Sequence, residues 1–206
     1  MNHIETIKLE KDLFYKKALI LKYSISYPKI TYSDYSNCME CFNLYNESIA
    51  LNLQRRAENE LFTEAKELYD FNSSNGYPLM TYEVMLDFNI TYNFDNLLSL
   101  YYDEYIFSGG AHGNTIRSSQ NWDLLNCYQV PFYCFWNNNP YFLIDVFKSI
   151  NRQIAENPEY FFDNYCELVL ETFNPESYYI TPNCLTVFFQ QYDIAPYSSG
   201  IQTFCV

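Results

Sequence analysis

The chain has 206 residues, of which 49% are hydrophobic and 20% aromatic, so it suits one packed domain or two small lobes rather than a disordered segment. Its net charge of −13 argues against nucleic acid or an anionic membrane as a partner, because like charges repel. Residues 1–66 hold nine basic and nine acidic residues, whereas residues 67–206 hold three and sixteen. This acidity favours a basic protein or a metal cation as partner, with solubility alone as the competing interpretation.

Seven cysteines cannot all pair within one chain, and no secretory signal precedes them. Free thiols in a reducing compartment are therefore the simpler prediction. The apolar run Ala18–Leu21 is too short for a signal peptide or a membrane span. These features favour a cytosolic protein unless an N-terminal anchor lies outside this sequence.

The first third of the chain predicts a hairpin followed by a long helix. Residues 1–12 are polar and resemble a loose lead-in, and Leu13–Ile30 alternates as a strand or hairpin does. Apolar residues then recur every four positions, which predicts one buried helix face. They are Tyr45, Ile49, Leu53, Ala57, Leu61 and Ala65, flanked by Phe42 and Leu68.

The middle of the chain predicts an antiparallel meander. Tyr77–Tyr105 contains an alternating strand, a turn at Asn93–Asn96 and a returning strand over Leu97–Phe107. A further strand is expected over Thr115–Leu124. The segment between, Ser108–Asn114, holds three of the five glycines, so it predicts a shaped turn with at least one positive φ.

The last third predicts two helices and a closing hairpin. Asn139-Pro140 reads as a helix start, Glu159–Phe173 as a second helix, and Gln129–Trp136 as a strand or tight connector. The expected architecture is α+β, a mainly antiparallel sheet packed by one long N-terminal helix and a helical pair before the C-terminal hairpin. We place the lobes at residues 1–76 and 77–206.

Few residues are candidates for chemistry. His112 lies among the glycines, and a histidine there is either a general base or a hydrogen-bonding group that fixes the loop. The loop lacks the lysine of a phosphate-binding loop, and the chain has no G-x-S-x-G nucleophile motif. Cys38 and Cys41 form one C-x-x-C without further ligands nearby, so we expect no zinc and no other metal or cofactor.

Two motifs resemble a known bacterial family. The first is the run Tyr105–Asn114, with its Gly-Gly-Ala-His-Gly-Asn sequence. The second is Ile180–Leu185 followed by Gln191–Gly200, which holds Gln-Tyr-Asp-Ile-Ala-Pro-Tyr. Together they resemble an extracytoplasmic domain of unknown function that forms the sensor end of the lysozyme-sensing anti-sigma factor RsiV. That domain also accompanies the catalytic domain of the peptidoglycan deacetylase PdaC, and residues 13–75 are similar to its smaller companion domain.

The resemblance implies a non-catalytic binding or sensor module of the cell envelope, with lysozyme or a peptidoglycan glycan as partner. It implies no catalytic residues, because in the deacetylase the chemistry belongs to a separate domain. We expect the two motif loops to make the contacts, through Ser108, Gly109, Gly110, His112, Asn114, Pro196 and Tyr197. Cys184 stands where the family pattern has a turn glycine. The resemblance sets an extracytoplasmic location against the cytosolic one that the missing signal favours.

The competing interpretation from another class is a small hydrolase that uses His112 with a nearby carboxylate. The binding module and the hydrolase require different surroundings for the His112 side chain. A hydrolase needs His112 in a concave pocket with a carboxylate or hydroxyl in hydrogen-bond reach, whereas a histidine that braces its own loop favours binding.

Overall fold

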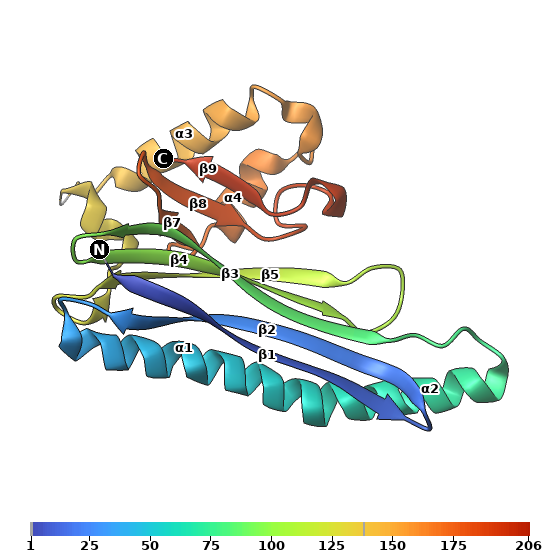
Figure 1. Ribbon diagram of the computed structural model, residues 1–206. Coiled ribbons are helices and arrows are strands. Elements are labelled where there is room, and N and C mark those ends of the chain that lie inside the picture. The colour runs from blue at the N-terminus through green and yellow to red at the C-terminus, as the bar shows by residue number, and fades with distance from the viewer. Residues whose placement is uncertain (1, 138) are drawn as a thin grey trace. The chain divides into compact units, whose positions relative to one another are not determined.

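The computed structural model describes residues 2–137 and 139–206 (Figure 1). It is an α+β fold, as predicted, and its strands form two sheets. The first sheet has six strands in the order β1-β2-β3-β4-β5-β6, and the second has three in the order β7-β8-β9. The first-sheet strands are β1 (His3–Tyr15), β2 (Ala18–Tyr32), β3 (Tyr82–Phe94), β4 (Leu97–Phe107), β5 (Asn114–Asp123) and β6 (Tyr128–Gln129). The second-sheet strands are β7 (Tyr178–Ile180), β8 (Leu185–Phe189) and β9 (Gln202–Cys205).

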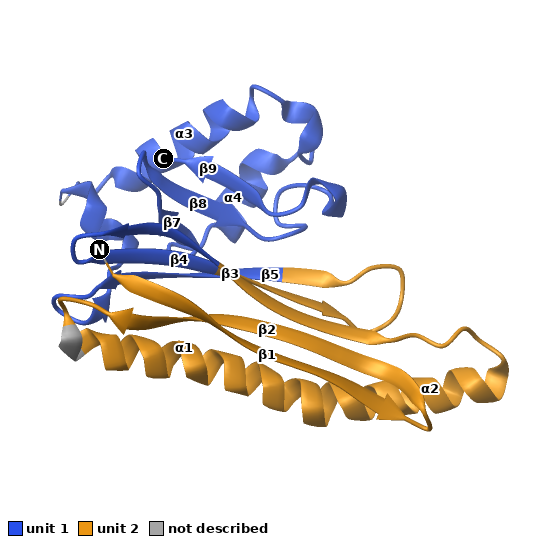
Figure 2. Ribbon diagram, in the orientation of Figure 1, with its two compact units in different colours: residues 1, 89–101, 116–206 blue, residues 2–88, 102–115 orange. Residues whose placement is uncertain are grey.

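The chain divides into two compact units, which Figure 2 colours separately. Unit 2 comprises residues 2–88 and 102–115, and unit 1 comprises residues 89–101 and 116–206. Strands β3, β4 and β5 each contribute residues to both units. The predicted division after residue 76 stays a prediction.

Unit 2 holds the long N-terminal helix, which runs beside β1 and β2 in Figure 1. The helix comprises α1 (Ser36–Arg56), a π-helical segment η1 (Ala57–Leu61) and α2 (Phe62–Asn75), and the left-handed Gly76 ends it. It serves as the crossover that makes β2 and β3 parallel. The predicted lead-in over residues 1–12 is wrong: β1 begins at His3 and pairs with β2 along its whole length. Backbone pairing there overrides the weak apolar pattern of the sequence.

The predicted helix stripe is correct in its second half and shifted in its first. Leu53, Ala57, Leu61 and Ala65 are buried, but Tyr45 is 43% exposed. In its place the buried row of the first half is Phe42, Asn46 and Ala50. A four-residue repeat drifts about 40° per step around an α-helix of 3.6 residues per turn. The wider turn of η1 offsets this drift between Leu53 and Ala65.

Unit 1 contains the second sheet and two helices, α3 (Phe142–Ile154) and α4 (Tyr165–Thr172). Its core joins α3, α4, β7, β8 and β9 and includes the fully buried Val146, Ile150, Ile154, Val169 and Ile194. Two predicted boundaries differ. Asn139 accepts a hydrogen bond from the Tyr141 backbone N–H (2.9 Å) as a turn before α3, so it does not cap the helix. The second helix begins only at Tyr165, because η3 (Pro158–Tyr160) and a loop precede it.

A buried polar network links the second sheet of unit 1 to strands of the first. The hydroxyl of Ser99 on β4 donates to Asn121 on β5 (2.7 Å) and accepts from the backbone N–H of Ile180 on β7 (2.8 Å). Asn121 donates in turn to the carbonyl of Tyr178 (2.8 Å). Ser99 and Asn121 are 0% and 4% exposed, so these bonds satisfy groups that would otherwise be costly to bury.

Asp123 at the end of β5 organises the following turn of unit 1. Its carboxylate accepts from the backbone N–H groups of Leu125 and Asn126 and from the side-chain amides of Asn126 and Asn96, over 2.8 to 3.1 Å. Burial raises the pKa of Asp123, but these hydrogen bonds outweigh it and leave the pKa below its ordinary value.

Replacing Asp123 with asparagine is expected to lower the free energy of unfolding by about 1–3 kcal/mol at neutral pH, the scale of a lost charged hydrogen bond. A carboxyl with a lowered pKa in the folded state stabilises above its unfolded pKa, and this contribution is lost as pH falls through the folded value. Urea unfolding of both proteins from pH 7 to about pH 3 should therefore show the difference shrinking on acidification. A difference that stays constant over this range would contradict the assignment.

Candidate functional site

The glycine loop of unit 2 is a shaped turn, as predicted. It connects β4 and β5, and such a short link between neighbouring strands makes them antiparallel. Gly109 and Gly110 have φ of +91° and +94°, a region that side chains rarely adopt. A Cβ on Gly109 would lie 3.1 Å from the Leu68 side chain of α2, so the loop approaches the helix closely at this point.

Gly113 and His112 give this loop its shape in different ways. Gly113 is buried, and a Cβ there would lie 2.4 Å from two ring carbons of Tyr105, so any other residue requires that ring to move. His112 is exposed, and its Nδ1 lies 3.0 Å from the carbonyl oxygen of Gly113. This contact is the kind expected of a histidine that braces its own loop. Ser108 and Asn114 are also exposed, so the loop presents polar groups to solvent.

The second motif lies in unit 1, and its residues 193–195, together with Gln190 just before the Gln191–Gly200 run, are structural. Gln190 makes two hydrogen bonds with the backbone of Arg117 on β5, accepting at 2.9 Å and donating at 2.7 Å. Asp193 accepts from the backbone N–H of Gln190 (2.7 Å), and burial raises the pKa of its carboxyl although this bond opposes the rise. Ile194 and Ala195 are 0% and 2% exposed. This part of the motif therefore fixes the fold.

The second half of the motif reaches the surface. Pro196 is exposed and Tyr197 half-buried, and Tyr197 begins the short helix η4 (Tyr197–Ser199), which ends at Gly200 with φ of +69°. The two predicted contact regions thus belong to different units, 108–114 to unit 2 and 196–197 to unit 1.

Unit 1 contains a groove of about 650 Å³, and two of its lining residues, Ser198 and Ser199, directly follow Tyr197 in the sequence. We call it the η3–η4 groove. Its walls come from the end of α3, from η3 and η4, and from β9. They are formed by Gln153, Glu156, Asn157, Tyr160, Phe161, Ser198, Ser199, Gln202, Thr203 and Phe204.

Hydrogen bonds within the protein fix the frame of the η3–η4 groove. The hydroxyl of Ser199 donates to the carbonyl of Tyr160 (3.0 Å), which ties η4 to η3. The amide of Gln202 donates to the carbonyl of Ser199 (2.5 Å). The second motif covers Ser198 and Ser199 but not the other lining residues, because the groove joins two distant stretches of the chain, residues 153–161 and 198–204.

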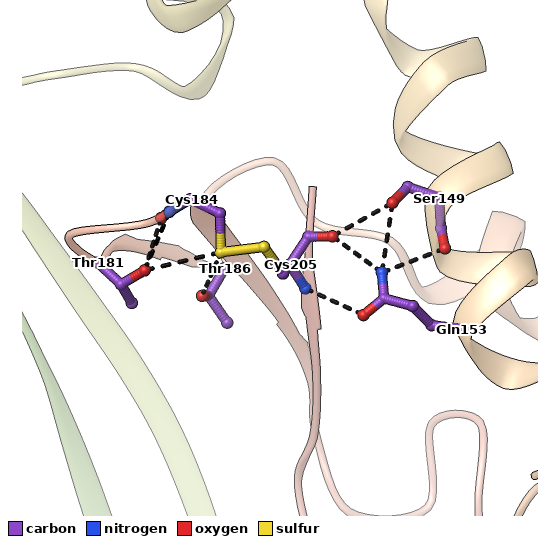
Figure 3. Close-up of a disulfide and its surroundings, with 6 residues drawn as sticks. All are labelled: Ser149, Gln153, Thr181, Cys184, Thr186 and Cys205. Carbon is purple, nitrogen blue, oxygen red and sulfur yellow. Dashed lines mark hydrogen bonds between the residues drawn. A yellow bond between two sulfur atoms is a disulfide. The ribbon is translucent and has the colours of Figure 1, made fainter. Parts of the chain in front are cut away.

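A disulfide holds one side of this region, and the prediction of free thiols is wrong for two cysteines. Cys184 and Cys205 are bonded, with 5.7 Å between their Cα atoms (Figure 3). Cys184 precedes β8 and Cys205 ends the neighbouring β9, a pairing that the sequence spacing does not reveal. Gln153 of α3 donates to the carbonyl of Cys205 (2.8 Å) and accepts from its N–H (3.3 Å), and Ser149 also donates to that carbonyl.

Residues 145–176 form an acidic segment, and the lining residues 153–161 of the groove belong to it. It holds seven exposed carboxylates and two basic residues, Lys148 and Arg152. In the part of the chain that the structure describes, every ion pair lies in unit 2, so none engages these carboxylates. They are Asp145, Glu156, Glu159, Asp163, Glu167, Glu171 and Glu176.

No three histidine, cysteine, aspartate or glutamate side chains gather as metal ligands among residues 2–137 and 139–206. Cys38 is buried and Cys41 exposed near the start of α1. We predict that protein purified without chelator or affinity-tag metal contains less than one equivalent of zinc by elemental analysis. One equivalent that is lost on replacing Cys38 and Cys41 with serine would overturn this prediction.

The helices of the described residues include none long and apolar enough to cross a membrane.

Comparison with known families assigns both parts of the chain. Residues 15–115 match the family model described as "Deacetylase PdaC", and residues 137–206 match "Protein of unknown function (DUF3298)". The chain thus matches a PdaC-type domain followed by a DUF3298 domain, the pair that the two motifs indicated. No characterised protein matches the sequence at a significant level.

Solved structures agree with this assignment at the level of the fold. A DUF3298 family member from Bacteroides fragilis superposes with a TM-score of 0.75 and 16% identity, over 100% of this chain and 90% of the other. A second, from Pseudomonas aeruginosa, gives a TM-score of 0.65 and 16% identity, over 100% and 91%. At this identity the likeness concerns the fold alone.

Proposed function

We propose that this protein is a non-catalytic binding module of the cell envelope whose partner is a cationic protein of the lysozyme type. The observation that carries the proposal is the acidic segment, whose seven exposed carboxylates face only two basic residues and form no ion pair within the described chain. Charges left without internal partners at a surface attract an oppositely charged protein and accelerate its association.

The contrast between the two units supports this proposal. In unit 2, Lys11 pairs with Glu58 at 2.9 Å and Lys16 with Asp70 at 2.6 Å, so part of its charge is balanced internally. In unit 1 the acidic segment has no such compensation. Solubility alone would need no such concentration in 32 successive residues.

The position of His112 gives less support to the competing hydrolase. Its side chain is exposed, and the Nδ1 contact is made to the carbonyl of the next residue. It does not line the η3–η4 groove. A general base needs a reacting group within reach in a site that holds the substrate.

Isothermal titration calorimetry with a cationic lysozyme tests the proposal. Binding is expected at low salt and should weaken at least about tenfold between 0.05 and 0.5 M salt, since the screening length falls from roughly 14 Å to 4 Å. A variant with Glu167, Glu171 and Glu176 changed to glutamine should bind more weakly than the native protein.

The matched control carries the same charge change in unit 2, through Glu5→Gln, Glu64→Gln and Glu67→Gln. These residues are also exposed, so the control keeps the net charge of the test variant. Equal loss of affinity in both variants would show only a general charge effect. Absence of heat at low salt, with folding confirmed by circular dichroism, would remove lysozyme as the partner.

A further inference from the structure

The charge on the lining of the η3–η4 groove is negative. Among the described residues that line it, Glu156 is the only charged one, and none is a lysine, arginine or histidine. Two of its amides are already engaged: Gln153 bonds the backbone of Cys205, and Gln202 bonds that of Ser199. These amides build the wall, and their hydrogen-bonding groups are directed to the protein itself.

A second set of polar groups in the groove remains available. None of its side chains makes a hydrogen bond or an ion pair in the described part of the protein. Glu156, Asn157 and Tyr160 are exposed, with Tyr160 at 59%, and so are Ser198 and Thr203. An ionised carboxylate only accepts hydrogen bonds, and hydroxyl and amide oxygens accept as well. The groove therefore offers an anionic acceptor, neutral groups that can accept or donate hydrogen bonds, and one accessible aromatic ring.

We propose that the η3–η4 groove binds an arginine side chain of the basic partner. A guanidinium carries a fixed positive charge and five N–H donors but no acceptor, so it complements this lining. Glu156 can take two of its donors in a bidentate pair. The ring of Tyr160 offers a face for stacking, an interaction of moderate strength at exposed sites. The inference rests on the proposed function, since it names the group by which a cationic partner is recognised.

The structure also explains why the groove would be formed before binding. The hydroxyl of Ser199 bonds the carbonyl of Tyr160, and the side-chain amide of Gln202 bonds the carbonyl of Ser199. Gln153 holds the strand that carries Thr203 and Phe204 through the backbone of Cys205. A site whose supporting groups are already bonded loses less conformational entropy on binding than a flexible one.

Charge around the groove adds to its selectivity. Glu156 lies shortly before η3 and Glu159 lies within it, and the acidic segment continues from there. An arginine on a basic protein would be drawn to this region over a distance set by salt screening. A neutral sugar chain gains nothing from this field.

The test uses nuclear magnetic resonance titration of the whole chain with the blocked tripeptide acetyl-Gly-Arg-Gly-amide. The control peptide replaces arginine with citrulline, which has nearly the same shape but no charge. Backbone signals of residues 153–160 and 198–204 are expected to shift with the arginine peptide, and the citrulline peptide should bind at least about tenfold more weakly. Glu156→Gln should weaken the arginine peptide by a similar factor, whereas Glu171→Gln on α4 should leave it unchanged.

Several results would overturn the inference. Equal binding of the two peptides would exclude recognition of the charge, and shifts outside the groove would exclude the location. Shifts in the groove with N-acetylglucosamine oligomers but not with the arginine peptide would make it a saccharide site instead.

The same variants separate the inference from the proposed function. If lysozyme binds in a salt-dependent way and Glu156→Gln binds it as the native protein does, the proposed function stands and the arginine site falls. If lysozyme does not bind but the arginine peptide occupies the groove, the site stands and its partner is a different basic protein.

Discussion

Removal of the Cys184–Cys205 disulfide is expected to lower the free energy of unfolding by about 3 kcal/mol. The bridge joins residues 21 positions apart, and in the chain-entropy model a closed loop of this length restricts the unfolded chain by about that amount. The loop contains β8, the second motif and β9, which are the elements that carry part of the η3–η4 groove.

Urea unfolding with and without dithiothreitol measures this effect. The native protein should lose about 3 kcal/mol in the reductant, and the Cys184→Ala, Cys205→Ala variant should be equally destabilised in both conditions. Cys166→Ala is the control, since Cys166 is exposed and forms no disulfide. An unchanged unfolding midpoint on reduction would show that the bridge does not stabilise the fold.

Gly113→Ala is expected to destabilise unit 2 by about 1–3 kcal/mol, the cost of forcing an extra methyl group into a filled space. The added Cβ would lie 2.4 Å from the ring of Tyr105, far inside contact distance, so that ring must leave its position. Gly113 does not have a positive φ, so the cost is steric.

A double-mutant cycle with Tyr105→Leu isolates this contact. The smaller side chain makes room for the methyl group, so Gly113→Ala should cost clearly less in that background. Additive losses would contradict the steric explanation. Gly110 provides the complementary case, because a Cβ there meets nothing within 4 Å but φ is +94°. Gly110→Val should cost more than about 1 kcal/mol through backbone strain alone.

The sequence predicted the elements whose patterns are local. Alternation located β3 and β4, and the clustering of glycines located the turn between β4 and β5 with its positive φ angles. The long helix was also clear, because a single helical period persists over many residues. Its phase required the structure, since the four-residue repeat stays buried only across the π-helical segment η1, and in the first half a different row is buried. A period in sequence does not record such a local change of pitch.

Two short motifs in the sequence indicated a class of function, but the role of each residue within them required the structure. Asp193 and Ile194 belong to the second motif, yet Asp193 bonds the backbone of Gln190, whose side chain is tied to β5, and Ile194 lies in the core of unit 1. Hydrogen bonds between residues 73 positions apart leave no periodic trace in the sequence. The strand at residues 3–15 was missed for the same reason, since its partner's backbone provides the stability.

The composition and the distribution of charged residues along the chain by themselves determined that this chain folds, that it is acidic, and that its excess charge lies beyond residue 66. They are sums over residues and need no knowledge of neighbours in space. Only the tertiary structure decided that Cys184 and Cys205 meet, and that two distant stretches of the chain line one groove with Glu156 and Tyr160 exposed. These features depend on the register of β8 against β9 and on side-chain hydrogen bonds that position η3 and η4, which arise only when distant parts of the chain pack together.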